Sequence, residues 1–358
     1  MSVFGAAVAM PSASEQGDPA QSTVQQTSPP APGRGQGPNF EAELQRQVQV
    51  DKLWHDASAG FMQMEKTSYK SRAGGMNIPV FVFKPLKTGG ARAHPALVWV
   101  HPDIRGRVYE YYIPYVRDAV ARGYVVIAPE YRGSIGYGQA HYDAIDYGGT
   151  EVDDVLTSVD YLKANVPEVD PARIGIIGWS HGGMITLLSI TREPTTFKAA
   201  AALVPVTNLF QRLAWAGVEA QHARIDPANR FGGLPNERRE VYKDRSPIYQ
   251  IDKLKIPLLV HITRNDGDVF VEEAMQLVDA LRARKADLSE TKIYDNPQGG
   301  HLFDRQCPAC GGRGGGQVDR TKVENWLPTM TREQRDSWNR VWTFLDWNLN
   351  PYQGAPPK

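Results

Sequence analysis

The amino-acid sequence predicts an α/β fold, with a mostly parallel central sheet and helices on both of its faces. Short continuous apolar runs, typical of strands buried on both sides, alternate along the chain with longer segments of helical periodicity. One apolar run, at residues 174–177, ends in glycine and turns sharply into a helical pattern. Such a turn is expected at the carboxyl end of a central strand, where sheets of this class hold their functional sites.

The expected elements follow one another from residue 41 onward. Residues 41–61 are predicted to form a lead-in helix, and two strands at residues 66–71 and 77–83 flank a glycine-containing turn. Further strands are predicted at residues 95–100, 124–128, 174–177, 199–204, 258–262 and 292–294. Further helices are predicted at residues 112–122, 151–164, 271–284 and 338–347, and directly after residue 180.

Residues 207–254 interrupt this alternation. They hold Trp215, Phe231 and two consecutive glycines, without a further buried-strand pattern. We expect a short helical insertion that lies over the functional site.

Length and composition predict one large domain. The chain has 358 residues, with 40 basic and 40 acidic side chains spread along it. We expect a domain at residues 41–350 between an N-terminal tail at 1–40 and a short tail at 351–358. The balanced charge gives no indication of a nucleic-acid partner, and no apolar run is long enough to span a bilayer. The oligomeric state is left open.

The N-terminal tail is predicted to be disordered over residues 12–38, which are rich in Gln, Ser, Pro and Gly. Residues 3–10 form a short, weakly apolar run that no Lys or Arg precedes. That run fits a truncated signal peptide and a plain tail equally well. The location is therefore left open between export, to the periplasm or the medium, and the cytoplasm.

The sequence Gly-Trp-Ser-His-Gly at residues 178–182 has the pattern of a nucleophile elbow. Glycine is needed two residues before and after Ser180, because side chains there would collide with the tightly turned chain. The turn exposes the Ser180 hydroxyl and aims the first N–H groups of the next helix at an oxygen attacked there. The alternative is a glycine-rich turn without chemistry.

A serine nucleophile needs a base, and the base needs a carboxylate that orients it. His301 follows the last predicted strand on a glycine-rich loop and is the candidate base. Asp266 and Asp268 both follow the strand at 258–262, and a tight turn favours acidic residues in any case, so the local pattern does not separate them. Serine, acid and histidine in this chain order match the arrangement of α/β-hydrolases.

Longer motifs resemble the catalytic domain of the prolyl oligopeptidase family, serine peptidase family S9 of the α/β-hydrolase superfamily. They are Glu-Tyr-Arg-Gly-Ser-Ile-Gly-Tyr-Gly at residues 130–138, Glu-Val-Asp-Asp-Val at 151–155, the stretch 170–183 around the elbow, and Ser-Pro-Ile at 246–248. The resemblance covers about residues 68–349. It implies two-step acyl transfer on a small peptide or ester, with no cofactor and no metal.

The resemblance also separates the two candidate acids. The family's acid loop, aligned by its Asp-x-x-Val end, falls on Asp266 and Val269. The alignment has two departures, because His-Ile at 261–262 replaces the usual His-Gly and the loop is one residue longer. The resemblance therefore implies Asp266 as the acid.

The oxyanion side of the site is also implied by the resemblance. One donor should be the backbone N–H of His181, and residues 101–106 correspond to the family's oxyanion loop. His101 and Asp103 in that loop, with Tyr131 nearby, are the further oxyanion or substrate-binding candidates. A donor role for the His101 side chain and a packing role at the strand end are both open.

Cys307 and Cys310 lie between His301 and Trp326, in a stretch with five glycines at 311–316. One Cys-x-x-Cys is neither a disulfide framework nor a zinc site. The glycines predict a flexible surface loop beside His301 instead of a second domain. If the protein is exported, oxidation can close a small ring there, and in the cytosol both thiols should stay reduced. An insertion without a role is the alternative.

Three functions follow from these patterns. The chain has only about a hundred residues ahead of the core strands, too few for the β-propeller that family peptidases usually carry. A small serine peptidase without a propeller is therefore our first expectation. A carboxylesterase resembling dienelactone hydrolase is the alternative, and a non-catalytic binding protein on a hydrolase scaffold is the third reading.

Overall fold

The computed structural model describes residues 38–215, 231–305 and 330–351. The expectations for the N-terminal tail, for Cys307 and Cys310, and for residues 352–358 lie outside the described residues.

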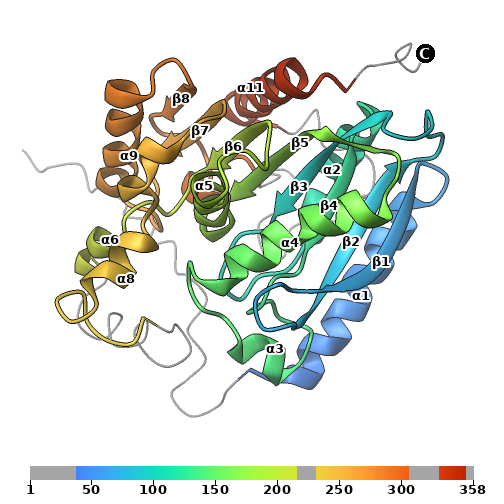
Figure 1. Ribbon diagram of the computed structural model, residues 1–358, viewed down its shortest axis with the longest axis horizontal. Coiled ribbons are helices and arrows are strands. Elements are labelled where there is room, and N and C mark those ends of the chain that lie inside the picture. The colour runs from blue at the N-terminus through green and yellow to red at the C-terminus, as the bar shows by residue number, and fades with distance from the viewer. Residues whose placement is uncertain (1–37, 216–230, 306–329, 352–358) are drawn as a thin grey trace, which may run out of the picture. The chain divides into compact units, whose positions relative to one another are not determined.

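In the described part of the chain, eight strands form one sheet in the order β1-β2-β4-β3-β5-β6-β7-β8 (Figure 1). The strands are β1 (Met62–Lys70), β2 (Asn77–Pro85), β3 (His94–Val100), β4 (Val125–Pro129), β5 (Val169–Trp179), β6 (Ala199–Leu203), β7 (Leu258–Thr263) and β8 (Ser289–Tyr294). Strand β2 pairs antiparallel with β1 and β4, and the other neighbours pair in parallel. The predicted α/β fold with a mostly parallel sheet is confirmed.

Helices cover both faces of the sheet (Figure 1). One layer holds α1 (Phe40–Ser58), α2 (Ile113–Ala121) and α11 (Arg332–Leu349), and the other holds α4 (Thr150–Asn165), α5 (His181–Arg192) and α9 (Val271–Arg284). Alternate residues of β3 enter the two layers: Leu97 and Trp99 pack with the first, and Val98 and Val100 with the second. Strands covered on both sides must be apolar throughout, which explains the continuous apolar runs.

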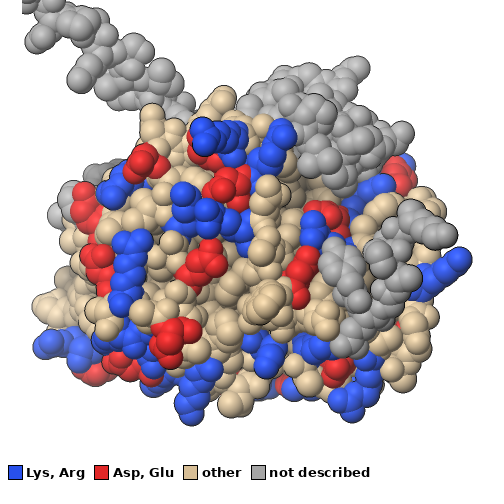
Figure 2. Space-filling model, turned by 90° about the horizontal axis from the view of Figure 1, so that it is seen from above, with Lys and Arg blue, Asp and Glu red and all other residues tan. Residues whose placement is uncertain are grey.

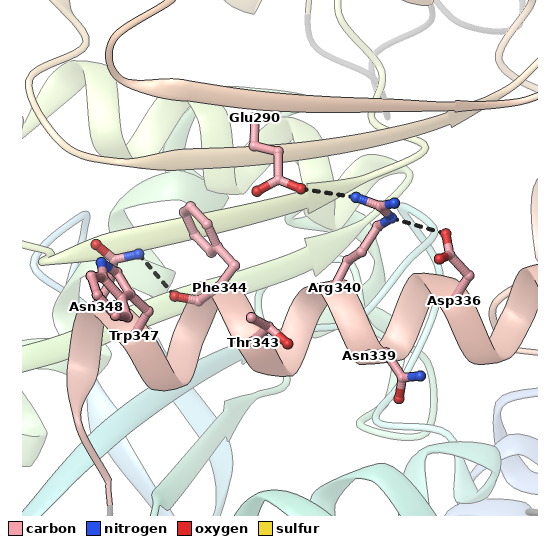
Figure 3. A pocket seen from close by; sticks show the side chains of 8 residues that line it. All are labelled: Glu290, Asp336, Asn339, Arg340, Thr343, Phe344, Trp347 and Asn348. Atoms are coloured by element: carbon pink, nitrogen blue, oxygen red, sulfur yellow. Dashed lines mark hydrogen bonds and ion pairs between the residues drawn. The ribbon is translucent and has the colours of Figure 1, made fainter.

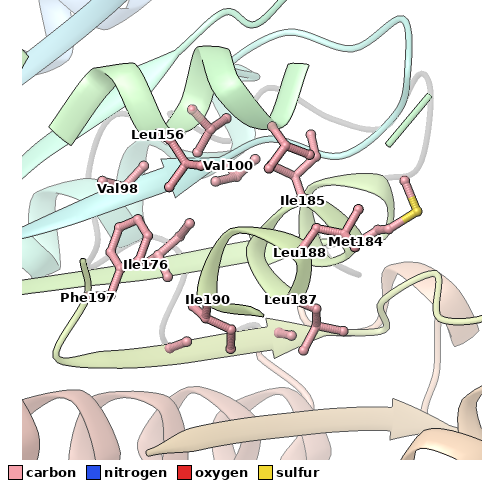
Figure 4. Close-up of a cluster of buried hydrophobic side chains, with 14 of the residues drawn as sticks. Val98, Val100, Leu156, Ile176, Met184, Ile185, Leu187, Leu188, Ile190 and Phe197 are labelled. Atoms are coloured by element: carbon pink, nitrogen blue, oxygen red, sulfur yellow. The ribbon is translucent and has the colours of Figure 1, made fainter. Parts of the chain in front are cut away.

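The core beneath the elbow helix is closely packed (Figure 4). Leu187 and Leu188 of α5 lie among side chains such as Val98 of β3, Leu156 of α4 and Ile176 of β5, and all are almost completely buried. Burial of each such side chain contributes about 1.5–3 kcal/mol. The helix that follows Ser180 is therefore held firmly against the sheet.

Several element boundaries differ from those expected. Strand β8 begins at Ser289, where polar residues at the sheet edge hide the strand pattern. Helix α11 begins at Arg332, because the Thr331 side chain accepts a hydrogen bond from the backbone N–H of Gln334 and caps the helix. The lead-in helix ends at Ser58 instead of residue 61, since β1 starts at Met62.

The interval between β6 and β7 is helical in its described parts, as expected. It holds α6 (Leu209–Trp215), α8 (Arg239–Asp244), η2 (Pro247–Tyr249) and η3 (Ile251–Lys253). Three other short elements are α3 (Gln139–Asp143), η1 (Glu110–Tyr112) and η4 (Gly300–Leu302). Of these, α3 was not expected, because five residues are too few for a helical period to be recognised.

The surface carries both signs of charge. On the face drawn in Figure 2, basic and acidic side chains are interspersed over the described residues and do not gather into a field of one sign. No helix among the described residues has both the length and the apolar character needed to cross a membrane.

Candidate active site

Ser180 directly follows β5 and precedes α5, on a strained turn with φ 55° and ψ −119°. A positive φ is costly for a residue with a side chain. The surroundings leave no space for side chains on either side. A Cβ at Gly178 would lie 2.3 Å from the carbonyl oxygen of Gly182, and one at Gly182 would lie 2.4 Å from the carbonyl oxygens of Val100 and His101. The elbow therefore requires glycine at both positions.

His301 connects Ser180 to a carboxylate. Its Nε2 lies 2.9 Å from Ser180 Oγ, and its Nδ1 lies 2.8 Å from Asp266 Oδ2. The three residues follow β5, β7 and β8, whose carboxyl ends meet at one edge of the sheet. This arrangement allows the imidazole to accept the Ser180 proton while the carboxylate stabilises the imidazolium.

Asp266 and Asp268 have different surroundings. Asp266 Oδ1 accepts hydrogen bonds from the backbone N–H groups of Asp268 and Val269, each at 2.8 Å, while Oδ2 faces His301. The Asp266 side chain is 2% exposed, whereas that of Asp268 is 48% exposed. Asp268 Oδ2 lies 3.7 Å from Nε2 of His301, on the serine side of the ring. Only Asp266 is placed at Nδ1, where an orienting carboxylate acts.

Arg212 of α6 holds the exposed end of the acid loop. Its guanidinium donates to the main-chain carbonyl of Asp268 at 3.0 Å and to Asp268 Oδ1 at 3.1 Å. Its Nε donates to the hydroxyl of Tyr147 at 3.0 Å. Arg212 was missed in the sequence, where nothing distinguishes it from the other basic residues of the insertion. The insertion thus contributes directly to the site.

His181 begins α5, so its backbone N–H is one of the first in a twelve-residue helix and lies beside Ser180. Its side chain turns away to Glu151, with Nε2 3.2 Å from Glu151 Oε1. Glu151 is fully buried and also accepts the backbone N–H of Gly148. Burial opposes ionisation of Glu151, but the hydrogen bond and charge of His181 lower its pKa overall. This buried contact with Glu151 thus anchors the residue after Ser180.

The His101 side chain is buried, and both ring nitrogens have partners within the fold. Nδ1 lies 2.8 Å from the carbonyl oxygen of Pro102, and Nε2 lies 2.9 Å from Ser134 Oγ. Burial lowers the His101 pKa to about 3, so the ring is neutral near neutral pH. In this geometry both nitrogens of the His101 ring are engaged within the fold, and the side chain supports the loop at 101–106.

Tyr131 lies behind the same loop. It is fully buried, its ring stacks on that of His101 at 4.1 Å, and its hydroxyl donates to the carbonyl of Asp103 at 2.6 Å. The structure therefore does not expose the Tyr131 hydroxyl to a substrate. Asp103 is exposed and has a φ of 67°, a conformation that the Tyr131 hydrogen bond helps to hold.

Strained backbone is concentrated around the site. Besides Ser180 and Asp103, Tyr147 and Val204 have positive φ values of 45° and 44°. Val204 directly follows β6, and the Tyr147 ring lies 4.9 Å from that of His181. Non-glycine residues in this region are uncommon and tend to gather at functional sites.

A separate groove of about 340 Å³ lies along β8 and α11 (Figure 3). Arg340 occupies its middle and donates to Asp336 at 2.9 Å and to Glu290 at 3.3 Å. Arg340 thus bonds to both carboxylates of the lining, and neither Ser180 nor His301 lines the groove. We assign it no chemistry.

Comparison with known proteins identifies relatives of this chain. The model described as "Prolyl oligopeptidase family" matches residues 112–312. The uncharacterized peptidase YuxL of Bacillus subtilis is 29% identical over 248 residues, which are 67% of this chain and 36% of that protein. Acylamino-acid-releasing enzyme 1 of Oryza sativa is 31% identical over 195 residues, 52% of this chain and 24% of that enzyme. The chain thus matches about a third or less of each relative's length.

A solved structure gives the same fold. The acylaminoacyl peptidase of Pyrococcus horikoshii superimposes with a TM-score of 0.61 at 20% identity, over 84% of this chain and 44% of that one. This similarity supports the assignment of an α/β-hydrolase fold.

The first prediction concerns the elbow. Replacing Gly182 with alanine should force α5 away from β3, because the new Cβ meets two carbonyl oxygens at 2.4 Å. We expect the rate of labelling by a fluorophosphonate to fall by about 100-fold, since a shift near 1 Å at a reacting group can have that effect. Gly267→Ala is the control, because no atom lies within 4 Å of its added Cβ. Equal labelling of both variants would contradict the steric argument.

The second prediction concerns the acid. Asp266→Asn should lower kcat by about 10⁴-fold, because an amide no longer holds the productive tautomer of His301. Asp268→Asn should lower it by less than about 10-fold, because Asp268 lies on the Nε2 side and pairs with Arg212. Steady-state kinetics of the two purified variants measure this difference. A larger loss in Asp268→Asn would assign the orienting role to Asp268.

Proposed function

This chain belongs to the prolyl oligopeptidase family, and from that premise we propose that it is a serine peptidase that cleaves small peptides through an acyl-enzyme. The observation that carries the proposal is one imidazole bonded to Ser180 Oγ at one nitrogen and to Asp266 at the other. Because the chain covers only part of its relatives, the proposal concerns the chemistry of this domain and extends to the whole protein by inference.

In the first step, His301 Nε2 takes the proton of Ser180 as Oγ attacks the peptide carbonyl carbon. The positive charge that forms on the imidazole faces Asp266 Oδ2. Asp266 itself is held by two backbone N–H groups on its other oxygen, so the carboxylate and the ring keep their orientation as the charge develops.

The oxyanion forms at the start of α5. We assign the backbone N–H of His181 as one donor, because it lies at a helix N-terminus beside Ser180. A backbone N–H of the loop at 101–106, with Asp103 as the leading candidate, is assigned as the second. His101 and Tyr131 act indirectly in this proposal, because their polar atoms bond to the loop itself.

To complete the first half of the reaction, His301 gives the proton taken from Ser180 to the leaving amine, which departs and leaves an acyl group on Ser180. In the second half, water deprotonated by the same imidazole attacks the acyl-enzyme, and His301 returns the proton to Ser180 Oγ as the second product leaves. The name of the rice relative describes the release of acylated amino acids, so an N-acylated peptide is the first substrate to test.

The third prediction concerns the nucleophile. Ser180→Ala should abolish labelling by a fluorophosphonate and lower kcat at least about 1,000-fold, because the attacking oxygen is removed. The fold should persist, since one hydroxyl is lost. Ser189→Ala is the matched control, because that buried hydroxyl on the same helix has no hydrogen-bond partner among the described residues. Wild-type hydrolysis by Ser180→Ala would refute the assignment.

The fourth prediction separates peptidase from esterase. The wild-type chain should hydrolyse both an N-acetylaminoacyl p-nitroanilide and p-nitrophenyl acetate, and both activities should disappear in Ser180→Ala. The anilide is decisive, because its poor leaving group must receive a proton from His301. Turnover of the acetate alone would favour a carboxylesterase, and failure of the wild type to react with fluorophosphonate would favour the non-catalytic reading.

A further inference from the structure

Asp304, three residues after His301, is a fully buried carboxylate that the proposed chemistry does not use. Its Oδ2 accepts a hydrogen bond from the indole N–H of Trp179 at 2.5 Å, and its Oδ1 accepts one from Nε of Arg305 at 3.3 Å. Burial raises the pKa of the Asp304 carboxyl, while the Arg305 charge and the Trp179 N–H act against that rise. A carboxylate is costly to bury, so its position calls for an explanation.

The main chain of Asp304 is held just as closely. Its carbonyl oxygen accepts hydrogen bonds from Trp338 Nε1 at 2.8 Å, from the hydroxyl of Tyr115 at 3.2 Å and from Gln334 Nε2 at 3.3 Å. Tyr115 belongs to α2, whereas Gln334 and Trp338 belong to α11. Two helices of one layer thus fix the point where the chain leaves the His301 turn.

The side-chain partners of Asp304 lead to both reacting residues. Trp179 is the residue before Ser180, and Nη2 of Arg305 donates a hydrogen bond to the carbonyl oxygen of His301. Strands β5 and β8 are separated by β6 and β7, which corresponds to about 14 Å. His301 reaches Ser180 only because the turn after β8 folds back over the sheet edge, and the Asp304 carboxylate connects that turn directly to the elbow.

We propose that Asp304 is a positioning residue, which ties the His301 turn to Trp179 and so keeps Nε2 of His301 within hydrogen-bond distance of Ser180. This inference rests on the proposed serine-peptidase chemistry. An apolar residue in its place would often leave the stability of a protein unchanged or improved, but it would accept neither the Trp179 nor the Arg305 hydrogen bond. The need to hold the His301 turn against Trp179 therefore explains why a carboxylate is buried at this position.

Two variants test the connection from its two ends. Asp304→Asn removes the charge, and Trp179→Phe removes the donor and keeps an aromatic ring in the core. The active fraction of each protein is titrated with a fluorophosphonate, and kcat is expressed per labelled site. We expect kcat per site to fall by about 10- to 100-fold in both variants, with KM within about twofold, because the reacting atoms are displaced while the substrate contacts remain.

A control and a double variant complete the test. Asp346→Asn removes a different carboxylate, which lies on α11 and bonds to Arg122 and Tyr124, and it should leave kcat per site unchanged. The double variant Trp179→Phe/Asp304→Asn should lose no more than the single variant with the larger loss, because both changes act on the same bond. A lower labelled fraction with wild-type kcat per site would overturn the proposal, as would losses that multiply in the double variant.

The hydrogen bond between Trp179 and Asp304 can be observed directly by NMR, without an activity assay. In spectra of protein labelled with ¹⁵N at tryptophan, Trp179→Phe assigns the Trp179 indole N–H, which should resonate downfield because its hydrogen bond to Asp304 is short. Asp304→Asn should move that signal, and an unmoved signal would overturn the inference. Failure of the wild type to react with fluorophosphonate would refute the proposed function instead, so the two failures are distinguishable.

Discussion

The close approach of α5 to the carboxyl ends of β3 and β5 is the constraint on which the site depends. Gly182 packs directly on the main-chain oxygens of Val100 and His101, with no room for a Cβ. That contact forces Ser180 into its strained turn, and the backbone N–H of Ser180 is anchored on the carbonyl of Leu203 in β6. Ser180, the N-terminus of α5 and the loop at 101–106 are brought together by one packing contact between backbones.

Buried charges support this constraint from behind. Arg132 donates to both carboxylate oxygens of Asp154, at 2.7 and 2.8 Å, and to the carbonyl of Ala73 at 2.8 Å. The neighbouring residue, Tyr131, holds the carbonyl oxygens of His101 and Asp103. Buried ion pairs contribute little net stability, because desolvation opposes their attraction. Their arrangement behind the loop at 101–106 is better explained by the geometry they impose than by any gain in folding free energy.

Local sequence patterns were sufficient to predict an element whose buried residues recur at a regular spacing. Helix α9 was predicted with its observed bounds, because Ala274, Leu277, Val278 and Leu281 recur at helical spacing and are buried. The edge strand β8 was predicted only from residue 292, since one of its sides is not covered by another strand and its first residues are polar. The period of a helix is visible in sequence, whereas the beginning of an edge strand is not.

Contacts between distant parts of the chain could not be predicted in the same way. Trp179 and Asp304 are 125 residues apart, and no local pattern connects an indole N–H to a carboxylate at that separation. Asp266 and Asp268 occupy equivalent places in the local sequence, and they are distinguished only in three dimensions, by their exposure and their distances to the two nitrogens of His301. The choice of Asp266 came from a family motif, which carries information about three-dimensional position that the turn residues alone lack.

The geometry of Ser180, Asp266 and His301 does not by itself determine the substrate class, which depends on other parts of the chain. Ser180, Asp266 and His301 lie on loops of the sheet, and the acyl transfer we propose for them applies to amides and esters alike. The insertion contributes residues beside them, since Arg212 of α6 bonds to both Asp268 and Tyr147. In the proposed mechanism, discrimination between peptide and ester substrates depends on how well these residues and the loop at 101–106 hold an amide while His301 protonates its nitrogen, because an activated ester does not need that proton transfer.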